Sequence, residues 1–400
     1  MTLSTIMFDI GRPVALDSVF STLDDNGVSW CLLRPEPSPS KGDDVDLLVS
    51  AADRKRIERL LNEAGFARIP AWGHGSHAFF SGYDALSDRW VHLDVVSELA
   101  FGPFFALRTA AAADCLRRRE RAEGVWVLHP DDGFWTLLLH NLLDKQAIQA
   151  KHRDRLGRLA ESARTENPLA RELDALGAPQ WRAARLLDRS RAGDWETLEA
   201  LAAELVSAWA RRRRFESAIA FVEMRLARRM AQLSSPLLLH GFGVALDTSE
   251  TGVVAAALDS SFPVPARRID MDLSGAWSRA LAARLYYTMG RIVILDRYGF
   301  GALPTQPTGV PRLARARRWV LAHVCPQPRL TVLFDSAKAE LDERNSEDGP
   351  RPDRRNHGRK RARRETVVVD ASRDSTVVHR ELVAMIWCAY CRDRRGSATS

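Results

Sequence analysis

Two aspartates separated by a single residue, Asp44 and Asp46, open a short apolar segment. If the segment is a strand, residues i and i+2 point to the same face, so the two carboxylates project together about 6–7 Å apart. Paired carboxylates hold a divalent ion such as Mg²⁺ against a phosphate. A third candidate, Asp94, lies in another strand-like segment, Trp90–Val96. Three carboxylates on two neighbouring strands would form a two-metal site for in-line attack at phosphorus.

A second polar set follows the apolar segment Arg291–Leu295, where Asp296, Arg297 and Tyr298 stand in a row. Ligands of open α/β sheets bind outside the carboxyl ends of the strands. This position therefore makes Asp296, Arg297 and Tyr298 candidate substrate-binding residues.

An arginine-rich segment follows later in the chain. Residues 351–364 contain eight Lys or Arg and one Asp, so this segment alone carries +7, which equals the formal charge of the whole chain. We interpret it as a loop that grips anionic ligands, with Arg359 and Arg363 as candidate ligands of phosphate. A solvated surface loop is the alternative interpretation.

The elements that must position these residues follow from the hydrophobic pattern. Up to about residue 125 helical and strand-like segments are mixed, and from 130 to 233 the pattern is helical. From 236 onward strands alternate with helices, which is typical of a parallel sheet with flanking helices. We predict an α/β protein with an α/β domain over 1–125, a helical region over 126–233 and a parallel-sheet domain over 234–400.

Individual elements can be assigned from the same pattern. The predicted strands are Trp30–Leu33, Val45–Val49, Ala78–Phe80, Trp90–Val96, Leu237–Leu246, Arg291–Leu295, Leu330–Phe334 and Thr366–Val369. The predicted helices include 14–26, 52–64, one that opens at Pro130, 275–289, 311–324 and 376–391. On the helix after Pro130 we interpret Trp135 and His140 as core residues.

The order of segments around the paired aspartates resembles the nucleotidyltransferase superfamily typified by DNA polymerase beta. The resemblance covers residues 14–100 and rests on Cys31–Arg34, on Gly42–Val49 and on the segment that contains Asp94. It implies an α/β fold in which Asp44, Asp46 and Asp94 bind Mg²⁺ or Mn²⁺ and an NTP, with ATP as the first candidate, is the co-substrate. Arg34 and the following proline stand where the family has Gly-Ser or Gly-Gly, so we expect the Arg34 guanidinium to hold phosphate instead.

The C-terminal part resembles the thymidylate kinase family of P-loop kinases over residues 237–391. The row Asp296, Arg297 and Tyr298 matches the Asp-Arg-aromatic motif that positions the acceptor nucleotide, and the arginine-rich segment matches the lid. The phosphate-binding loop departs from the family. After the first strand the sequence has Gly252, but valines replace the lysine and hydroxyl residues of G-x-x-x-x-G-K-[ST]. We therefore predict that this degenerate loop does not bind ATP in the usual manner.

Composition limits the remaining choices. No run of about 18 apolar residues occurs, so we expect no transmembrane helix and no membrane partner. Five dispersed cysteines argue against a disulfide framework and favour the cytoplasm. The basic excess is confined to one segment rather than spread over a face, so we do not expect a nucleic-acid partner. The pattern leaves the oligomeric state open.

Two histidines and a pair of cysteines have structural as well as functional explanations. His74 and His77 could approach the carboxylates, but we favour surface histidines. Cys388 and Cys391 have redox or zinc spacing, yet no second pair of ligands lies nearby in the sequence.

Three hypotheses of function result. The first is metal-dependent transfer of a nucleotidyl group from an NTP to a small-molecule acceptor, with the kinase-like part as a binding or regulatory module in a biosynthetic role. The second is an ATP-dependent small-molecule or nucleotide kinase with an altered phosphate site. The third is a non-catalytic binding protein. The three carboxylates favour the first hypothesis over the third, and the degenerate loop opposes the second.

Overall fold

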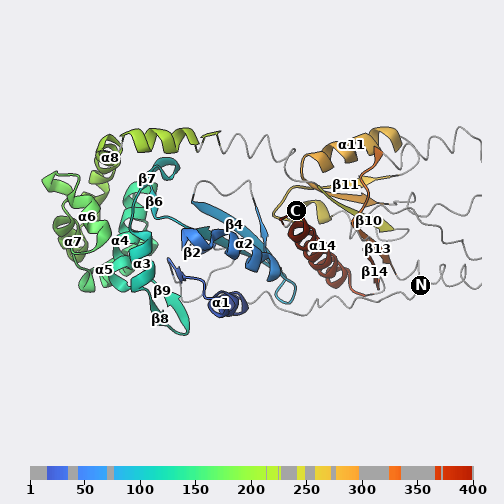
Figure 1. The fold of residues 1–400 in the computed structure, drawn as a ribbon, viewed down its shortest axis with the longest axis horizontal. Coiled ribbons are helices and arrows are strands. Elements are labelled where there is room, and N and C mark those ends of the chain that lie inside the picture. The colour runs from blue at the N-terminus through green and yellow to red at the C-terminus, as the bar shows by residue number, and fades with distance from the viewer. Residues whose placement is uncertain are drawn as a thin grey trace, which may run out of the picture. The chain divides into compact units, whose positions relative to one another are not determined.

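Two larger sheets, one of seven and one of five strands, organise the described residues (Figure 1). The computed structural model describes residues 16–34, 44–69, 76–212, 214–223, 225–226, 241–247, 257–271, 276–296, 324–334, 365–370 and 373–398. The chain divides into an N-terminal unit of residues 14–82 and 90–232 and a C-terminal unit made chiefly of residues 233–400. The predicted α/β class is confirmed. The predicted boundary at residue 125 stays a prediction.

The N-terminal unit is built on a seven-stranded mixed sheet with the order β3-β4-β5-β2-β1-β9-β8. Its strands are β1 (Trp30–Leu32), β2 (Val45–Val49), β3 (Ala67–Arg68), β4 (His77–Asp84), β5 (Arg89–Val96), β8 (Glu120–Ala122) and β9 (Val125–Val127). A small separate pair joins β6 (Ala100–Phe101) and β7 (Leu107–Arg108). β2 lies between β1, to which it is antiparallel, and β5, to which it is parallel. The predicted strands at the two aspartate segments are thus confirmed as neighbours.

Helices cover both faces of this sheet. The α-helices of the unit include α1 (Leu16–Asp25), α2 (Arg54–Glu63), α3 (Ala112–Arg118), α4 (Pro130–Leu139), α5 (Ala150–Ser162), α6 (Pro168–Asp174), α7 (Ala183–Ala192) and α8 (Trp195–Arg212), and further helical residues follow in 214–223 and 225–226. On one face Leu47 and Val49 of β2 pack in a cluster with apolar side chains of α1 and α2. On the other face Leu48 joins the larger cluster formed with the later helices. The alternation along β2 therefore separates two cores.

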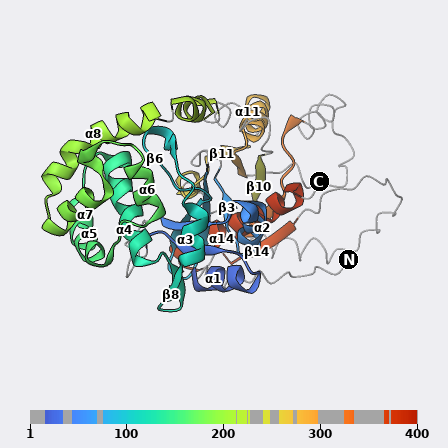
Figure 2. The same ribbon diagram turned by 60° about the vertical axis from the view of Figure 1, so that its left-hand side comes forward.

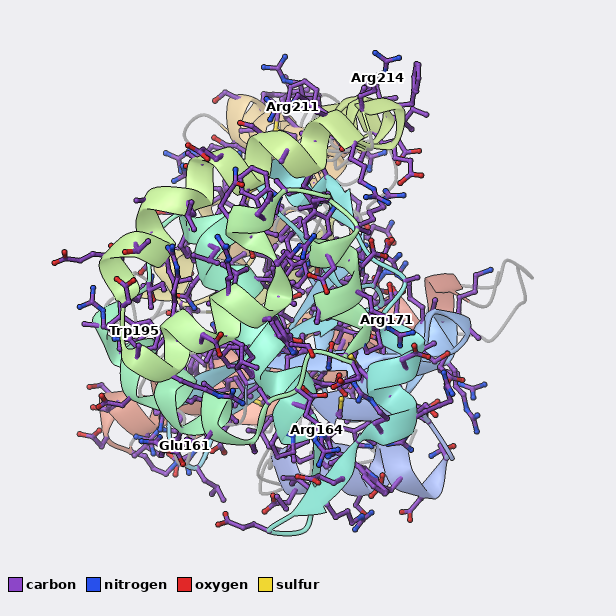
Figure 3. The ribbon with its side chains drawn as sticks, turned by 90° about the vertical axis from the view of Figure 1, so that its left-hand side faces the viewer. Glu161, Arg164, Arg171, Trp195, Arg211 and Arg214 are labelled. Atoms are coloured by element: carbon purple, nitrogen blue, oxygen red, sulfur yellow. The ribbon has the colours of Figure 1, made fainter. Side chains whose placement is uncertain are left out.

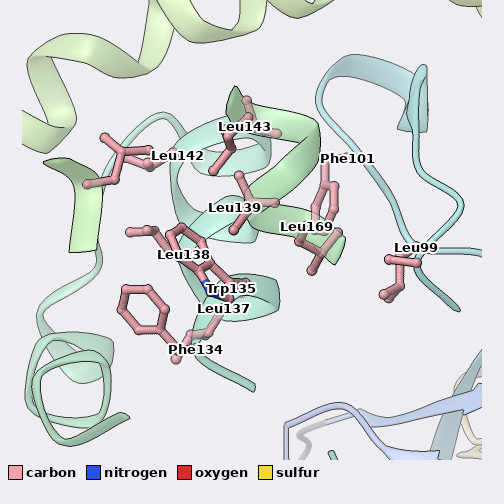
Figure 4. Close-up of a cluster of buried hydrophobic side chains, with 14 of the residues drawn as sticks. Leu99, Phe101, Phe134, Trp135, Leu137, Leu138, Leu139, Leu142, Leu143 and Leu169 are labelled. Carbon is pink, nitrogen blue, oxygen red and sulfur yellow. The ribbon is translucent and has the colours of Figure 1, made fainter. Parts of the chain in front are cut away.

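The larger core surrounds α4. Trp135 and the leucines at 137, 138 and 139 are buried and pack with Phe101 of β6 and Leu169 of α6 (Figure 4). The predicted core position of Trp135 is confirmed, since its side chain is fully buried. α4 continues directly into a π-helical turn, His140–Lys145. Such turns redirect side chains within a helix and often occur at functional sites.

The C-terminal unit contains a five-stranded, entirely parallel sheet with the order β11-β12-β10-β13-β14. Its elements are β10 (Phe242–Asp247), β11 (Ala266–Asp270), α11 (Ala276–Thr288), β12 (Ile292–Asp296), β13 (Leu330–Phe334), β14 (Glu365–Val369) and α14 (Ser375–Ala398). The predicted parallel sheet is confirmed. β11 was not predicted. The expected helix over 311–324 lies almost wholly outside the described residues.

Helices flank this sheet on both faces (Figure 2). Ala280 and Ala283 of α11 pack on Val293 of β12. Phe242 of β10 makes an edge contact with Tyr390 of α14 at 5.9 Å between ring centroids. Phe242 is the register partner of Ile292, which points away from Val293 as the adjacent residue in β12. α11 and α14 therefore cover opposite faces.

Candidate functional site

Asp46 and Asp94 lie side by side at the centre of the N-terminal sheet. They are register partners on the parallel strands β2 and β5, so their side chains project from the same face of the sheet about 5 Å apart at the backbone. Asp94 is 6% exposed. Asp44 precedes β2 by one residue and is exposed. The structure thus brings two of the three predicted carboxylates into direct adjacency and places the third at the start of the same strand.

Arg34 is held against Asp46. β1 ends at Leu32, and the N–H of Leu33 continues the ladder by donating to the Asp46 carbonyl at 3.0 Å. The Arg34 side chain then donates to Asp46 Oδ2 from Nε at 2.8 Å and approaches it from Nη2 at 2.6 Å. The predicted phosphate ligand is thus paired with a predicted metal ligand.

His140 connects Arg34 to a second carboxylate. Its Nδ1 lies 2.7 Å from Asp144 Oδ2, and its Nε2 lies 2.9 Å from Arg34 Nη1. A guanidinium can only donate, so Nε2 must accept, and the proton is on Nδ1, where Asp144 accepts it. The π-helical turn supplies both His140 and Asp144. The interpretation of His140 as a core residue is wrong, because its side chain is 20% exposed and lines the site.

His77 holds Asp94. Its Nδ1 lies 2.8 Å from Asp94 Oδ2, and its ring stacks on Phe105 with 4.0 Å between centroids. The other carboxylate oxygen, Asp94 Oδ1, is buried and has no hydrogen-bond partner among the described residues. The interpretation of His77 as a surface residue is therefore wrong. His74 lies outside the described residues.

The electrostatics of Asp46 reflect this environment. Burial raises the pKa of the Asp46 carboxyl above its usual value, and the charge of neighbouring Asp94 raises it further, while Arg34 acts in the opposite direction. Two adjacent carboxylates repel each other in a partly buried site, so positive charge beside them is stabilising. Arg34 supplies that charge in this structure.

A cavity of about 610 Å³ connects these residues with the helical part of the unit. Asp44, Asp46, Asp94, Arg34 and His140 contribute to its walls. The remaining lining residues are Leu16, Asp17, Phe20, Leu32, Val45, Glu123, Val125, Lys145, Gln149, Lys151 and His152. Sequence reasoning missed the contributions of the π-helical turn and α5. The sequence feature that could have drawn attention to this wall is its lysines. The chain has only six, and two of them, Lys145 and Lys151, line the cavity.

The C-terminal candidates are placed only in part. Asp296 ends β12, as predicted, and is 1% exposed. Arg268 of β11 donates to its Oδ2 from Nε at 3.0 Å, an ion pair that sequence reasoning did not anticipate. The other predicted ligands lie outside the described residues: Arg297, Tyr298, Arg359, Arg363 and the degenerate loop with Gly252.

The structure also places the cysteine pair that the sequence analysis considered. Cys388 is exposed and Cys391 is buried, and both lie on α14. Across the described ranges, no three His, Cys, Asp or Glu side chains are grouped so that they could hold a metal ion. Within the same ranges, none of the helices combines the length and apolar composition needed to cross a bilayer.

Comparisons with models of protein families, with curated proteins and with solved structures found no match for this chain.

Proposed function

We propose that the N-terminal unit transfers a nucleotidyl group from an NTP, with ATP as the first candidate, to a small-molecule acceptor. The observation that carries this proposal is the pairing of Asp46 with Asp94 across two parallel strands, inside a cavity that also contains arginine and lysine side chains. Adjacent carboxylates suit a divalent ion, and the basic side chains suit phosphate.

The residues present fit Mg²⁺ or Mn²⁺. Both ions prefer carboxylate oxygens, and Asp94 Oδ1 is a buried oxygen without a hydrogen-bond partner among the described residues. Asp46 and Asp94 would hold the ion once Arg34 leaves Asp46, and Asp44 would have to move toward them from the start of β2, because the three carboxylates are not grouped as metal ligands in the present arrangement. When bound, the ion would neutralise charge on the phosphates and on the leaving group.

The chain's own residues then have distinct roles. In nucleotidyl transfer an acceptor hydroxyl forms a bond to the α-phosphorus, the bond from that phosphorus to the β-phosphate oxygen breaks, and pyrophosphate leaves. His77 orients Asp94 through Oδ2, so Oδ1 is the atom available to the ion or to the proton of the acceptor hydroxyl. Arg34, once released from Asp46, is placed to bind phosphate with its planar pair of N–H donors.

The C-terminal unit enters the proposal as a binding or regulatory module. Asp296 lies at the carboxyl end of a strand in an open parallel sheet, where ligands bind. Asp296 is paired there with Arg268, so an acceptor that binds Asp296 must displace that arginine. The kinase hypothesis predicts transfer of the γ-phosphate of ATP, and the non-catalytic hypothesis predicts no transfer.

The experiment that tests the proposal measures which phosphate of ATP is transferred to the acceptor. The full chain is incubated with Mg²⁺, a mixture of small-molecule acceptors and ATP labelled at the α- or the γ-phosphate, in parallel with Asp94→Asn. Asp188→Asn is the matched control, because Asp188 is an exposed aspartate of α7. We expect transfer of the α-label by the unaltered chain and the control, and none by Asp94→Asn. Transfer of the γ-label, or α-transfer that survives Asp94→Asn, would contradict the proposal.

A further inference from the structure

We infer that the amino-terminal end of α5, together with Lys145, Lys151 and His152, is a subsite for a polyphosphate anion. The identity of that anion, the triphosphate of the NTP or its pyrophosphate product, rests on the proposed function. The existence of the subsite does not, because it is argued from the charges and contacts of the helical wall of the cavity.

The first element of this subsite is the helix end itself. α5 has 13 residues, and Gln149 at its N-cap position makes no side-chain capping bond. The first N–H groups of an α-helix have no acceptor within the helix, and the helix dipole adds partial positive charge there. In α5 the N–H of His152 donates to the Gln149 carbonyl at 2.8 Å, so the N–H groups left for a ligand are those of Ala150 and Lys151. The chain just before the helix is held in place, since the N–H of Gln149 donates to Asn141 Oδ1 at 3.2 Å. Gln149 and Lys151 both line the cavity, so this end faces it.

His152 is an independent sign of a missing ligand. Its side chain lines the cavity, and the residue is only 7% exposed. No hydrogen bond to its ring occurs among the described residues. Burial, and next to it the charge of Lys151, lowers the pKa of His152 to about 4. The ring is therefore neutral at pH 7, with one N–H donor that lacks an acceptor. The ring nitrogens of His152 are not among the fully enclosed unpaired atoms of the described residues, so the donor opens onto the cavity, where an anion would accept its hydrogen bond.

The third element is a pair of lysines. Lys145 ends the π-helical turn and Lys151 lies in the first turn of α5; both are exposed, and both line the cavity. Neither forms an ion pair within the described part of the chain. Arg34 differs from these lysines, because its guanidinium forms an ion pair with Asp46. A lysine ammonium is a compact charge on a flexible stem and binds phosphate as a point charge.

The acidic residues of the cavity lie on other elements than the two lysines. Asp46 and Asp94 belong to the sheet and Asp44 precedes β2, while Lys145 and Lys151 belong to the π-helical turn and to α5. The two further acidic lining residues are Asp17 of α1 and Glu123 between β8 and β9. A polyphosphate with one end on the helical wall would present its other end toward the carboxylates. This division of charge assigns the anion to the helical wall and the divalent ion to the sheet.

Figure 3 shows the helical side of the unit, where Glu161 marks the far end of α5. Glu161 is exposed. The dipole of α5 therefore has its positive end at the cavity and its negative end at the outer surface.

The test uses the full chain, inorganic pyrophosphate as the probe and EDTA to exclude divalent ions. Calorimetric titration measures its affinity for the unaltered chain and for Lys145→Gln, Lys151→Gln, His152→Gln and the double lysine variant. Lys55→Gln is the matched control, because Lys55 lies on α2 and does not line the cavity. We expect pyrophosphate to bind at least tenfold more weakly to each single lysine variant, and the control to bind as the unaltered chain does.

A second readout locates the anion directly. Only six lysines occur in the chain, so acetylation followed by mass spectrometry resolves each of them. Pyrophosphate should protect Lys145 and Lys151 and leave Lys55 reactive. Absence of binding to the unaltered chain, or equal binding by the double lysine variant, would overturn the inference.

The two proposals can fail separately. Protection of Lys145 and Lys151 by pyrophosphate without any transfer of the α-label would retain the anion subsite and remove nucleotidyl transfer. Transfer of the α-label at an unchanged rate and KM by the double lysine variant would retain the reaction and remove the subsite. Asp94→Asn should bind pyrophosphate in EDTA at least as tightly as the unaltered chain, because it removes a negative charge from the cavity.

Discussion

Replacement of Arg34 by glutamine should change the affinities for a free ion and for an ion–nucleotide complex in opposite directions. Arg34 occupies Asp46 Oδ2 through two nitrogens, at 2.8 Å and 2.6 Å. A divalent ion that binds Asp46 must displace this contact. Glutamine retains polarity and removes the competing charge, so the ion should bind more tightly to Arg34→Gln.

The expected magnitude follows from the environment of the pair. A hydrogen bond to a charged group contributes about 1.5–3 kcal/mol net. The side chains are 28% and 12% exposed, so solvent screens the pair and about 2 kcal/mol is a reasonable value for the whole contact. That energy corresponds to roughly 30-fold tighter binding of Mg²⁺ by Arg34→Gln.

The nucleotide complex should show the opposite sign. If the released guanidinium binds phosphate, its loss removes a charge-assisted contact, and Mg²⁺-ATP should bind about tenfold more weakly to Arg34→Gln than to the unaltered chain. Calorimetric titrations with Mg²⁺ alone and with Mg²⁺-ATP measure both changes.

The matched control for this experiment is Arg68→Gln. Arg68 forms an exposed pair with Glu58 at 3.6 Å, elsewhere in the same unit, and does not line the cavity. Its replacement should change neither affinity. The reasoning would be refuted if Arg34→Gln bound Mg²⁺ no more tightly than the unaltered chain, or if both affinities fell by the same factor.

Three further predictions concern stability. Arg268→Gln should destabilise the C-terminal unit by about 3 kcal/mol in urea unfolding, because the carboxylate of Asp296, 1% exposed, would lose the neighbouring positive charge; an unchanged midpoint would contradict this. Gly102→Ala should cost about 1–3 kcal/mol, since φ is +74° and the added Cβ would lie 2.7 Å from a leucine side chain, whereas Gly157→Ala in α5 should be neutral or stabilising. The pKa of His152 is about 6.5 in the unfolded chain and about 4 in the folded unit, so protonation of His152 by itself should lower stability by about 1–2 kcal/mol between pH 7 and pH 4.5. Urea titrations across this range should give a flatter profile for His152→Asn, and an equal slope would be evidence against the buried neutral imidazole.

Much of the fold is readable from local patterns. Leu330–Phe334 was predicted with its observed bounds because a short apolar segment between polar turns is the mark of a buried strand. β11 was missed because Arg267 and Arg268 interrupt its apolar pattern. The reason for Arg268 is tertiary, since its partner Asp296 is contributed by the neighbouring strand β12.

The candidate site was predictable to the extent that it is local in sequence. The spacing of Asp44 and Asp46 predicted a shared strand face, and a second aspartate-bearing strand suggested Asp94. In the structure Asp46 lies on β2 and Asp44 just before it. The contacts of Arg34 with His140 join residues 106 positions apart, through a π-helical turn that has no local sequence signature. No pattern in a single sequence gives such a contact.

The helical wall was hidden for a related reason. Lys145 and Lys151 look like ordinary surface lysines in a helical region, and only the packing of that region against the sheet brings them into the cavity.

The most direct test of the account is whether Asp46 and Asp94 together bind an ion–nucleotide complex. Mg²⁺-ATP is titrated calorimetrically into the full chain, into Asp46→Asn/Asp94→Asn and into the exposed control Asp188→Asn, with circular dichroism to verify that each is folded. The account predicts binding by the unaltered chain and the control, and its loss in the double variant. Unchanged binding by the folded double variant, or no binding by the unaltered chain, would contradict it.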